Sequence, residues 1–219
     1  NLVSNIALVA LGFLVAVTIH EFAHALIADR LGDPTPRLQG RLTLNPLAHL
    51  DPLGTILPLL LIFSGSPLVF GWGKPVQFDP YNLANPRRDA ALISLAGPVS
   101  NILLAILLSL VLRFLVIPTA PLGVLREITF VAAALIQWNI GLAVFNLIPM
   151  HPLDGGKILI ALLPQKDAVE ADRFMTRYGS LFLLLLILPI WGNTAPISLI
   201  TYPIIKFLMS LLLPTNLIV

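Results

Sequence analysis

Residues 2–28 read LVSNIALVALGFLVAVTIHEFAHALIA, a run long enough to cross a bilayer, since a spanning helix needs about 20 apolar residues. The composition agrees, because 57% of all residues are hydrophobic and 11% are charged, against roughly 45–50% and about 25% in soluble domains. Gly and Pro interrupt long apolar runs and do not form polar linkers. The composition therefore excludes disorder and an ordinary soluble enzyme, and the sequence predicts an all-α polytopic membrane protein.

Further apolar runs predict the rest of a helical bundle. They occupy residues 53–70, 90–117, 127–148, 179–191 and 195–213. We expect about five to six membrane segments in a single membrane-embedded domain, residues 1–219, with a core at residues 1–163. Residues 164–219 are expected to hold an amphipathic helix, at residues 167–178, and the C-terminal membrane segments. The first run carries the motif described below, so we do not expect a cleaved signal peptide there.

The region between the first run and residue 90 is predicted to be less regular. Residues 37–44 alternate polar and apolar side chains, which favours a short strand. Residues 71–78 are expected to be extended because of their Gly and Pro content. Together they would form a short membrane-associated β-hairpin, either as a roof over the site or as an edge that receives a substrate strand. The run at 53–70 is interrupted by Pro58 and by the turn sequence at 64–67, so we expect a re-entrant segment.

Charge and cysteine content limit the possible partners. The formal net charge is +2 and the pI is near 9.2. The basic residues are scattered through loops and form no stripe with interleaved aromatics, so nucleic acid is not an expected partner. The chain contains no cysteine, which excludes disulfides and thiolate metal ligands.

The pentapeptide HEFAH at residues 20–24 is the first candidate for chemistry. His20 and His24 are four residues apart, so they share one face of a helix and can reach one ion. Glu21 is rotated from His20 by about 100°, so it stands beside the ion and is free to act as a base. Three ionisable side chains in an apolar span are costly without an ion or a partner. We therefore favour a metal site over two core histidines and a chance glutamate.

A metal site of this kind needs a third protein ligand. Asp154 is the best candidate because the two glycines that follow it allow a tight turn beside an ion. The alternative role for Asp154 is a helix N-cap ahead of residues 157–163. His49 is more simply explained as a loop histidine that is hydrogen-bonded to its neighbour Asp51, and His151 is left without a role.

Three motifs occur in order, each attached to an apolar helix: HEFAH at 20–24, AGPVSN at 96–101 and NLIPMHPLDGG at 146–156. This arrangement resembles the site-2 protease family of intramembrane zinc metalloproteases, in the small bacterial form that lacks a PDZ domain. The resemblance extends over residues 2–157.

The resemblance implies one zinc ion (Zn2+) per chain, bound by His20, His24 and Asp154, with Glu21 as the general base. Asn146 matches an asparagine assigned to holding the substrate or the oxyanion. The implied activity is that of a zinc metalloendopeptidase in regulated intramembrane proteolysis, which hydrolyses transmembrane or membrane-proximal segments. The implied partners are the lipid bilayer and a membrane-protein substrate, either a single-span helix or a signal-peptide remnant.

Two other functions compete with proteolysis. A metal-ion transporter or sensor would also place histidines and acids in the membrane, although a pore needs Glu21 as a ligand and a hydrolase needs it as a base. An inactive scaffold related to the protease is the second alternative. For Asn146, a helix–helix hydrogen bond explains the residue equally well, and for Asn101 it is the favoured role. Gly97 is expected to let residues 90–117 approach the first helix closely.

The metal site also constrains the topology. His24 lies near the end of the first run and Asp154 just past residues 127–148, so both runs must end on one side of the membrane. If residues 53–70 are re-entrant, ten Lys and Arg residues lie on that side and two on the other. The positive-inside rule then makes the first side cytoplasmic. We expect a multi-pass plasma-membrane protein whose active site opens toward the cytoplasm; the alternative is a spanning 53–70 segment and a site near the midplane.

Overall fold

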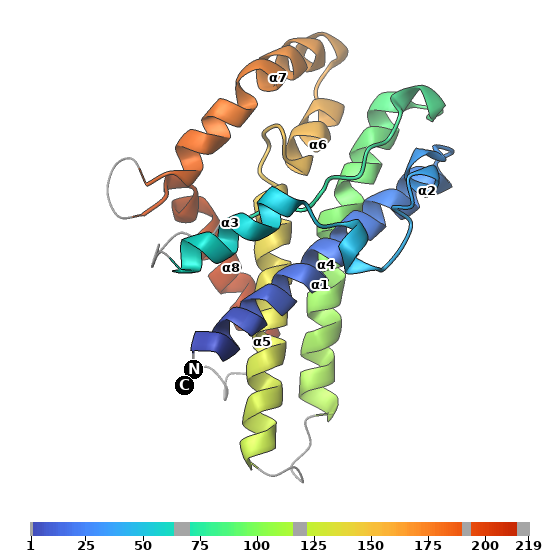
Figure 1. Cartoon of the computed structure of the whole chain (residues 1–219). Coiled ribbons are helices and arrows are strands. Elements are labelled where there is room, and N and C mark those ends of the chain that lie inside the picture. Colours follow the sequence, from blue (N-terminus) through green and yellow to red (C-terminus); the bar gives the residue numbers. More distant parts are fainter. Residues whose placement is uncertain (1, 64–70, 116–121, 190–193, 214–219) are drawn as a thin grey trace.

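The computed structural model describes residues 2–63, 71–115, 122–189 and 194–213 (Figure 1). Its helices are α1 (Leu2–Arg30), α2 (Thr35–Leu38), η1 (Pro46–Ala48), α3 (Pro52–Phe63), η2 (Pro80–Asn82), α4 (Pro86–Leu115), α5 (Leu122–Asn146), α6 (Asp154–Leu162), α7 (Gln165–Ile187) and α8 (Pro196–Leu212). These described residues form no strand and pair only through an isolated antiparallel bridge between Leu50 and Gly73. The predicted all-α class is confirmed, and the predicted β-hairpin is not.

Three helices are long and apolar enough to cross a membrane. They are Ala7–Arg30 in α1, Pro86–Phe114 in α4 and Glu127–Asn146 in α5. The helix α8 is apolar but shorter, with 17 residues. On α4 the side chains of Leu107 and Phe114 are 57% and 73% exposed, an outward apolar surface that suits a bilayer. The chain is therefore a helical membrane protein, but the expected five to six segments are not confirmed by the described helices.

The helices α4 and α5 lie side by side, and α1 crosses both of them (Figure 1). An apolar cluster joins α4 and α5, and side chains of α8 pack against it. Its buried members are Ala105, Leu112, Ile136, Ile140 and Val144. The crossing of α1 over this pair places the polar half of α1 inside the bundle.

The residues that follow the predicted re-entrant segment lie beside the start of α3. The helix α3 has 12 residues, a length of about 18 Å, whereas the hydrocarbon core of a bilayer is about 30 Å thick. The amide of Trp72 donates to the carbonyl of Gly54 at 3.3 Å, and Gly71 lies against Pro58. The two described ends of the segment therefore lie side by side, as expected of a re-entrant segment. The turn sequence at residues 64–67 lies outside the described residues.

The strand predicted at residues 37–44 is wrong. Pro34 and Pro36 open the short helix α2 there, since proline fits the first turn of a helix, and Gly40 then turns the chain with a φ of +67°. The alternation of polar and apolar residues does not indicate a strand here, because Arg41 is buried, with 4% of its surface exposed. Its guanidinium donates to the carbonyls of the loops around it and not to a partner strand.

The predicted amphipathic helix at 167–178 and the predicted membrane segment at 179–191 are not separate elements. Residues 167–187 of these two predicted elements belong to α7, a continuous helix of 23 residues, and residues 190 and 191 lie outside the described residues. Gly179 does not break the helix, because it serves packing: a Cβ there would lie 2.5 Å from the carbonyl oxygen of His151. The change from polar to apolar composition therefore occurs within one helix.

The end of α1, the start of α4 and all of α6 lie at one end of the bundle (Figure 1). Asp33, just after α1, accepts from the Asp79 amide at 2.7 Å and from Asn82 Nδ2 at 2.8 Å. Arg87, in the first turn of α4, donates from Nη2 to the carbonyl of Ile160 in α6 at 2.6 Å. The helices α1 and α5 therefore end at the same end of the bundle, and α4 and α5 are the two helices that run between these ends. This arrangement agrees with the topology expected from the shared metal site.

Replacement of Asp33 tests how much its hydrogen bonds stabilise this end of the bundle. Burial opposes its ionisation, but hydrogen bonds from Thr35, Asn82 and the Asp79 backbone outweigh that effect and lower the pKa below the ordinary 3.8. We expect Asp33→Asn to destabilise the protein at neutral pH by about 1–3 kcal/mol. The loss should shrink as the pH falls below 3.8, because the ionised carboxylate then no longer stabilises the native protein.

Unfolding of detergent-solubilised protein, measured across that acidic range, checks this. The exposed Asp167→Asn is the matched control and should change stability little. Equal stability of the wild-type protein and the Asp33 variant at neutral pH would contradict the role given to Asp33.

Candidate metal centre

The two histidines of the pentapeptide face each other on α1 and point toward α4. Their rings are 4.5 Å apart between centroids, and the residues are 4% and 7% exposed. Helix α4 passes them at Gly97, where an added Cβ would lie 2.4 Å from Nε2 of His24. The expected close approach of α4 to α1 is therefore observed, and the absence of a side chain at Gly97 makes it possible.

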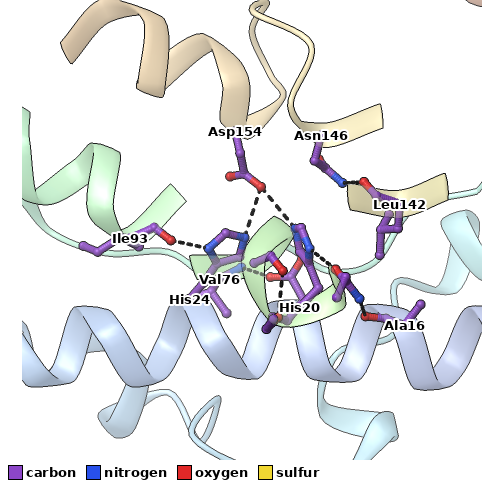
Figure 2. A network of polar contacts seen from close by, with 12 residues as sticks. Ala16, His20, His24, Val76, Ile93, Leu142, Asn146 and Asp154 are labelled. Carbon is purple, nitrogen blue, oxygen red and sulfur yellow. Dashed lines mark hydrogen bonds and ion pairs between the residues drawn. The ribbon is translucent and has the colours of Figure 1, made fainter. Parts of the chain in front are cut away.

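Asp154 joins the two histidines from the opposite side of the site (Figure 2). Its Oδ2 lies 3.1 Å from Nε2 of His20 and 3.2 Å from Nε2 of His24. The possible ligand atoms of the three residues all lie within 4.8 Å of one another. Asp154 is the first residue of α6, after the N-cap residue Leu153, so the alternative N-cap role is wrong. The structure thus brings together the three residues expected to bind metal.

Hydrogen bonds on the outer ring nitrogens fix the orientation of both histidines (Figure 2). Nδ1 of His24 donates to the carbonyl of Ile93 at 2.7 Å. Nδ1 of His20 lies 2.7 Å from Oδ1 of Asn101. The amide nitrogen of Asn101 donates to the carbonyl of Ala16 at 2.9 Å and to Oδ1 of Asn139 at 2.8 Å, which leaves its Oδ1 as the acceptor for His20. Asn101 thus forms the expected helix–helix hydrogen bond and also orients a candidate ligand.

This pattern is what a bound cation requires. When both Nδ1 atoms carry hydrogen in neutral rings, both Nε2 atoms present lone pairs, and they do so toward a carboxylate oxygen. Three acceptors at such short separations repel one another unless a positive charge lies between them. Metal-ligating histidines typically donate their other N–H to a carbonyl or carboxylate, as these two donate to an amide and a peptide carbonyl. The donor set therefore fits a metal ion, and zinc in particular accepts imidazole and carboxylate ligands.

Glu21 lies beside this group and outside it. Its Oε2 accepts a hydrogen bond from the amide of Val76 at 2.8 Å. It is not part of the group of three possible ligands, as expected of a base that does not bind the metal. Residues 71–78, predicted to be extended, thus contact Glu21 directly.

Arg41 holds these residues in place, and sequence reasoning missed it. Its guanidinium donates to the carbonyls of Ala48 and Lys74, and to that of Pro75 at 3.0 Å. Burial lowers the pKa of Arg41, while the nearby charge of Glu21 raises it. A lone arginine in a loop gives no sequence signal for this contact, because the three carbonyls belong to segments that only the fold brings together.

The predicted residues Asn146 and His49 make hydrogen bonds outside the group of three possible ligands. Asn146 ends α5, and its Nδ2 donates to the carbonyl of Leu142 in its own helix at 3.0 Å. His49 is fully buried and its Nε2 lies 2.7 Å from the carbonyl of Thr43, so the expected bond to Asp51 is wrong. That carboxylate instead accepts from the amide of Gly54 at the start of α3.

His151 lies in the loop before α6 and faces α7. Its Nε2 is 3.5 Å from Oδ1 of Asp172. Burial lowers the pKa of His151, and Asp172 opposes that effect. Neither His151 nor His49 joins the metal-ligating group found among the described residues.

Two cavities meet at the site. The larger has a volume of about 510 Å³ and an apolar, partly aromatic lining that includes Phe13, Trp138 and Leu183. The smaller has a volume of about 110 Å³ and reaches from the metal-ligating group to Lys157 and Ser94. Both are lined by His20, Glu21, Pro75, Asn146 and Pro152. The candidate base and Asn146 therefore stand where an apolar space and a polar space join.

Comparison with known proteins identifies a family and several relatives to which this chain is similar. The family model described as Peptidase family M50 matches residues 118–186. The chain is 37% identical over 183 residues to "Putative zinc metalloprotease YwhC" of Bacillus subtilis, a match that covers 81% of this chain and 78% of that protein. It is 32% identical over 189 residues to "Putative zinc metalloprotease Rip2" of Mycobacterium tuberculosis, covering 83% and 66% of the two chains. No solved structure matches the chain.

A helical membrane fold with a buried His-His-Asp group, in a chain with these relatives, defines a zinc metalloprotease. The chain belongs to peptidase family M50, the site-2 protease family. These findings support the protease over the ion transporter and over the inactive scaffold.

Asp154 is the ligand whose removal is most informative, because it lies far from the histidines in sequence. We expect Asp154→Ala to bind zinc much more weakly, since only two imidazoles would remain. After dialysis, the zinc content should fall from about one ion per chain to a small fraction. Elemental analysis of the purified protein measures this.

The exposed Asp167→Ala should retain its zinc and serves as the matched control. Unchanged zinc content in the Asp154 variant would show that another group completes the metal site.

Proposed function

We propose that this protein is an intramembrane zinc metalloendopeptidase in which His20, His24 and Asp154 bind one zinc ion. The observation that carries the proposal is the placement of Glu21: it stands beside three convergent ligand atoms without joining them. A hydrolase needs this separation between metal ligands and base.

The chemistry follows from these positions. Zinc held by three protein ligands supplies a Lewis acid that polarises a peptide carbonyl and acidifies a water. Glu21 accepts the proton of the attacking water and later gives it to the leaving amine. The amide of Val76, 2.8 Å from Oε2, keeps the carboxylate of Glu21 oriented while the proton is transferred.

Asn146 is proposed to stabilise the charge that develops on the substrate oxygen. It lines both cavities next to Glu21 and His20. One hydrogen of its Nδ2 is directed to the carbonyl of Leu142, so the second hydrogen is available to an oxyanion. The alternative assigned to Asn146, a helix–helix bond, is not what the described structure contains, since Leu142 belongs to the same helix.

The proposed substrate is a membrane-protein segment, either a single-span helix or a signal-peptide remnant, with the lipid bilayer as its surroundings. Backbone carbonyls in a helix are already hydrogen-bonded, so the segment must unwind before hydrolysis. The extended residues 71–78 line the cavities and contact Glu21, and they are suited to receive an unwound strand by β-augmentation. The proposed process is regulated intramembrane proteolysis, and no nucleic acid takes part.

We place the end of the bundle that holds the site in the cytoplasm, in a multi-pass plasma-membrane protein. Arg37, Arg88 and Arg173 all belong to the basic set that the positive-inside rule assigns to the cytoplasmic side. The contacts of Arg87 with α6 and of Asp33 with the loop before α4 support a common side for these regions.

Loss of the base tests the catalytic proposal. Glu21→Gln should keep zinc and the fold, because Glu21 is not among the possible ligands, and should lower proteolysis by at least about 100-fold. The assay is cleavage of a panel of tagged single-span proteins by purified protein in detergent or liposomes. Chelation of zinc should abolish the wild-type activity, and re-addition of zinc should restore it.

Glu170→Gln, at an exposed position of α7, is the control and should be fully active. The assigned role of Glu21 is wrong if its variant loses zinc or keeps wild-type activity. The proposed function itself fails if the wild-type protein cleaves no member of the panel with zinc present.

The orientation can be tested separately on this cysteine-free chain. Single cysteines replacing Arg37, Arg88 and Arg173 should all react with a membrane-impermeant thiol reagent from the cytoplasmic face only. A cysteine replacing the exposed Glu127, near the other end of α5, should react from the opposite face. Labelling of the Arg37 and Arg88 positions from different faces would disprove the re-entrant arrangement of residues 53–70.

A further inference from the structure

The smaller cavity extends beyond the metal-ligating group to residues that the proposed chemistry leaves without a role. Its lining also includes Ser94, Phe78 and Lys157. The volume of about 110 Å³ is several times the space needed by one water, about 10–15 Å³ on the same measure. The cavity can therefore admit a side chain beside the reacting groups.

Ser94 offers this cavity a buried polar group without a protein partner. It is 1% exposed, and its Oγ has no hydrogen-bond partner in the described structure. A buried polar atom left unpaired costs about 1–3 kcal/mol. A bound group that accepts or donates a hydrogen bond at Ser94 Oγ would remove this cost.

Lys157 offers the same cavity a positive charge. It follows Asp154 by one helical turn, and its Nζ lies 4.6 Å from the centre of the Phe78 ring, a cation–π contact. The described residues place no carboxylate within ion-pair distance of it. Burial lowers the pKa of Lys157, and the charges of Asp154 and Glu21, which lie farther away, oppose that effect. The N–H donors of the ammonium group are therefore available to a ligand.

The charges of the lining favour an anion. Glu21 and Asp154 contribute two negative charges and Lys157 one positive charge, and the histidines are neutral as ligands. A divalent zinc ion makes the sum positive by one. An acidic substrate group would neutralise this excess, whereas a basic group would add to it.

Building on the proposed proteolytic function, we propose that Lys157 and Ser94 form a subsite that binds the carboxylate of an Asp or Glu side chain in the substrate. The acidic residue lies close to the scissile bond, because His20, Glu21 and Asn146 line this cavity as well as the larger apolar one. Lys157 donates to the carboxylate from Nζ and Ser94 donates from Oγ. The protease therefore selects segments that carry an acidic residue beside the bond that it cleaves.

The test uses a substrate that the wild-type protein cleaves, with the scissile bond located by mass spectrometry. Each of the three positions on either side of that bond is replaced in turn by Asp, Asn or Lys. At one of these positions we expect the substrate that carries Asp to be cleaved about tenfold faster than the substrate that carries Lys. Lys157→Glu should reverse this preference, and Lys157→Met should make Asp and Asn equivalent. The exposed Lys166→Glu, on α7, should leave the wild-type preference unchanged.

A binding measurement separates specificity from loss of activity. Fluorescent versions of the Asp and Lys substrates are bound to zinc-loaded Glu21→Gln protein, with and without Lys157→Met or Ser94→Ala. The Asp substrate should bind more tightly, and each additional substitution should reduce that advantage. The inference is overturned if no position favours Asp, or if the preference survives both Lys157 substitutions in cleavage or in binding. A wild-type protein that cleaves no substrate refutes the proposed function first and the subsite with it.

Discussion

The crossing of α1 and α4 at Gly97 is the contact on which the site depends. Residues 93, 97 and 101 are spaced by four, so they lie on one face of α4, and the two histidines of α1 have the same spacing. With no side chain at Gly97, the helices come close enough for Ile93 to accept from His24 and for Asn101 to face His20. One close crossing therefore orients both rings. A larger residue at position 97 would separate the rings from the groups that fix them.

Pro98, the residue after Gly97, also affects α4 at this crossing. Pro98 lies inside α4 and has no N–H to donate to the carbonyl four residues earlier, which belongs to Ser94. Proline in the middle of a helix is normally destabilising, and it is tolerated in membrane helices where neighbouring groups satisfy the backbone. Here the turn that it loosens borders the metal-ligating group and the smaller cavity. The Gly-Pro pair thus combines close packing with one missing backbone hydrogen bond in α4 at the site.

Local periodicity allowed part of this site to be predicted from the sequence. The His20–His24 spacing is a property of one helix. The two glycines after Asp154 lie in the first turn of α6 and not in a separate turn, and the missing side chain at Gly155 lets α6 approach the carbonyls of residues 147 and 148. Asn101 could be predicted as a polar residue in an apolar helix that needs a partner. Asp33 and Arg41 could not be found in this way, because most of their partners are separated from them by long stretches of chain. Alternation at 37–44 failed as evidence for a strand since it counted a buried, hydrogen-bonded arginine as an outward polar residue.

The segment 71–78 connects the lining of both cavities to the carboxylate of Glu21. A carboxylate in apolar surroundings is costly unless hydrogen bonds and nearby charges offset its lost hydration. For Glu21 the hydrogen bond comes from Val76, and the nearby positive charge comes from Arg41, which also binds the carbonyls just before Val76. The extended segment that lines both cavities therefore also holds the carboxylate of Glu21 in position. In the proposed function, a substrate strand that pairs with this segment would be bound next to a carboxylate that the same backbone already orients, so substrate alignment and proton transfer would depend on one set of hydrogen bonds.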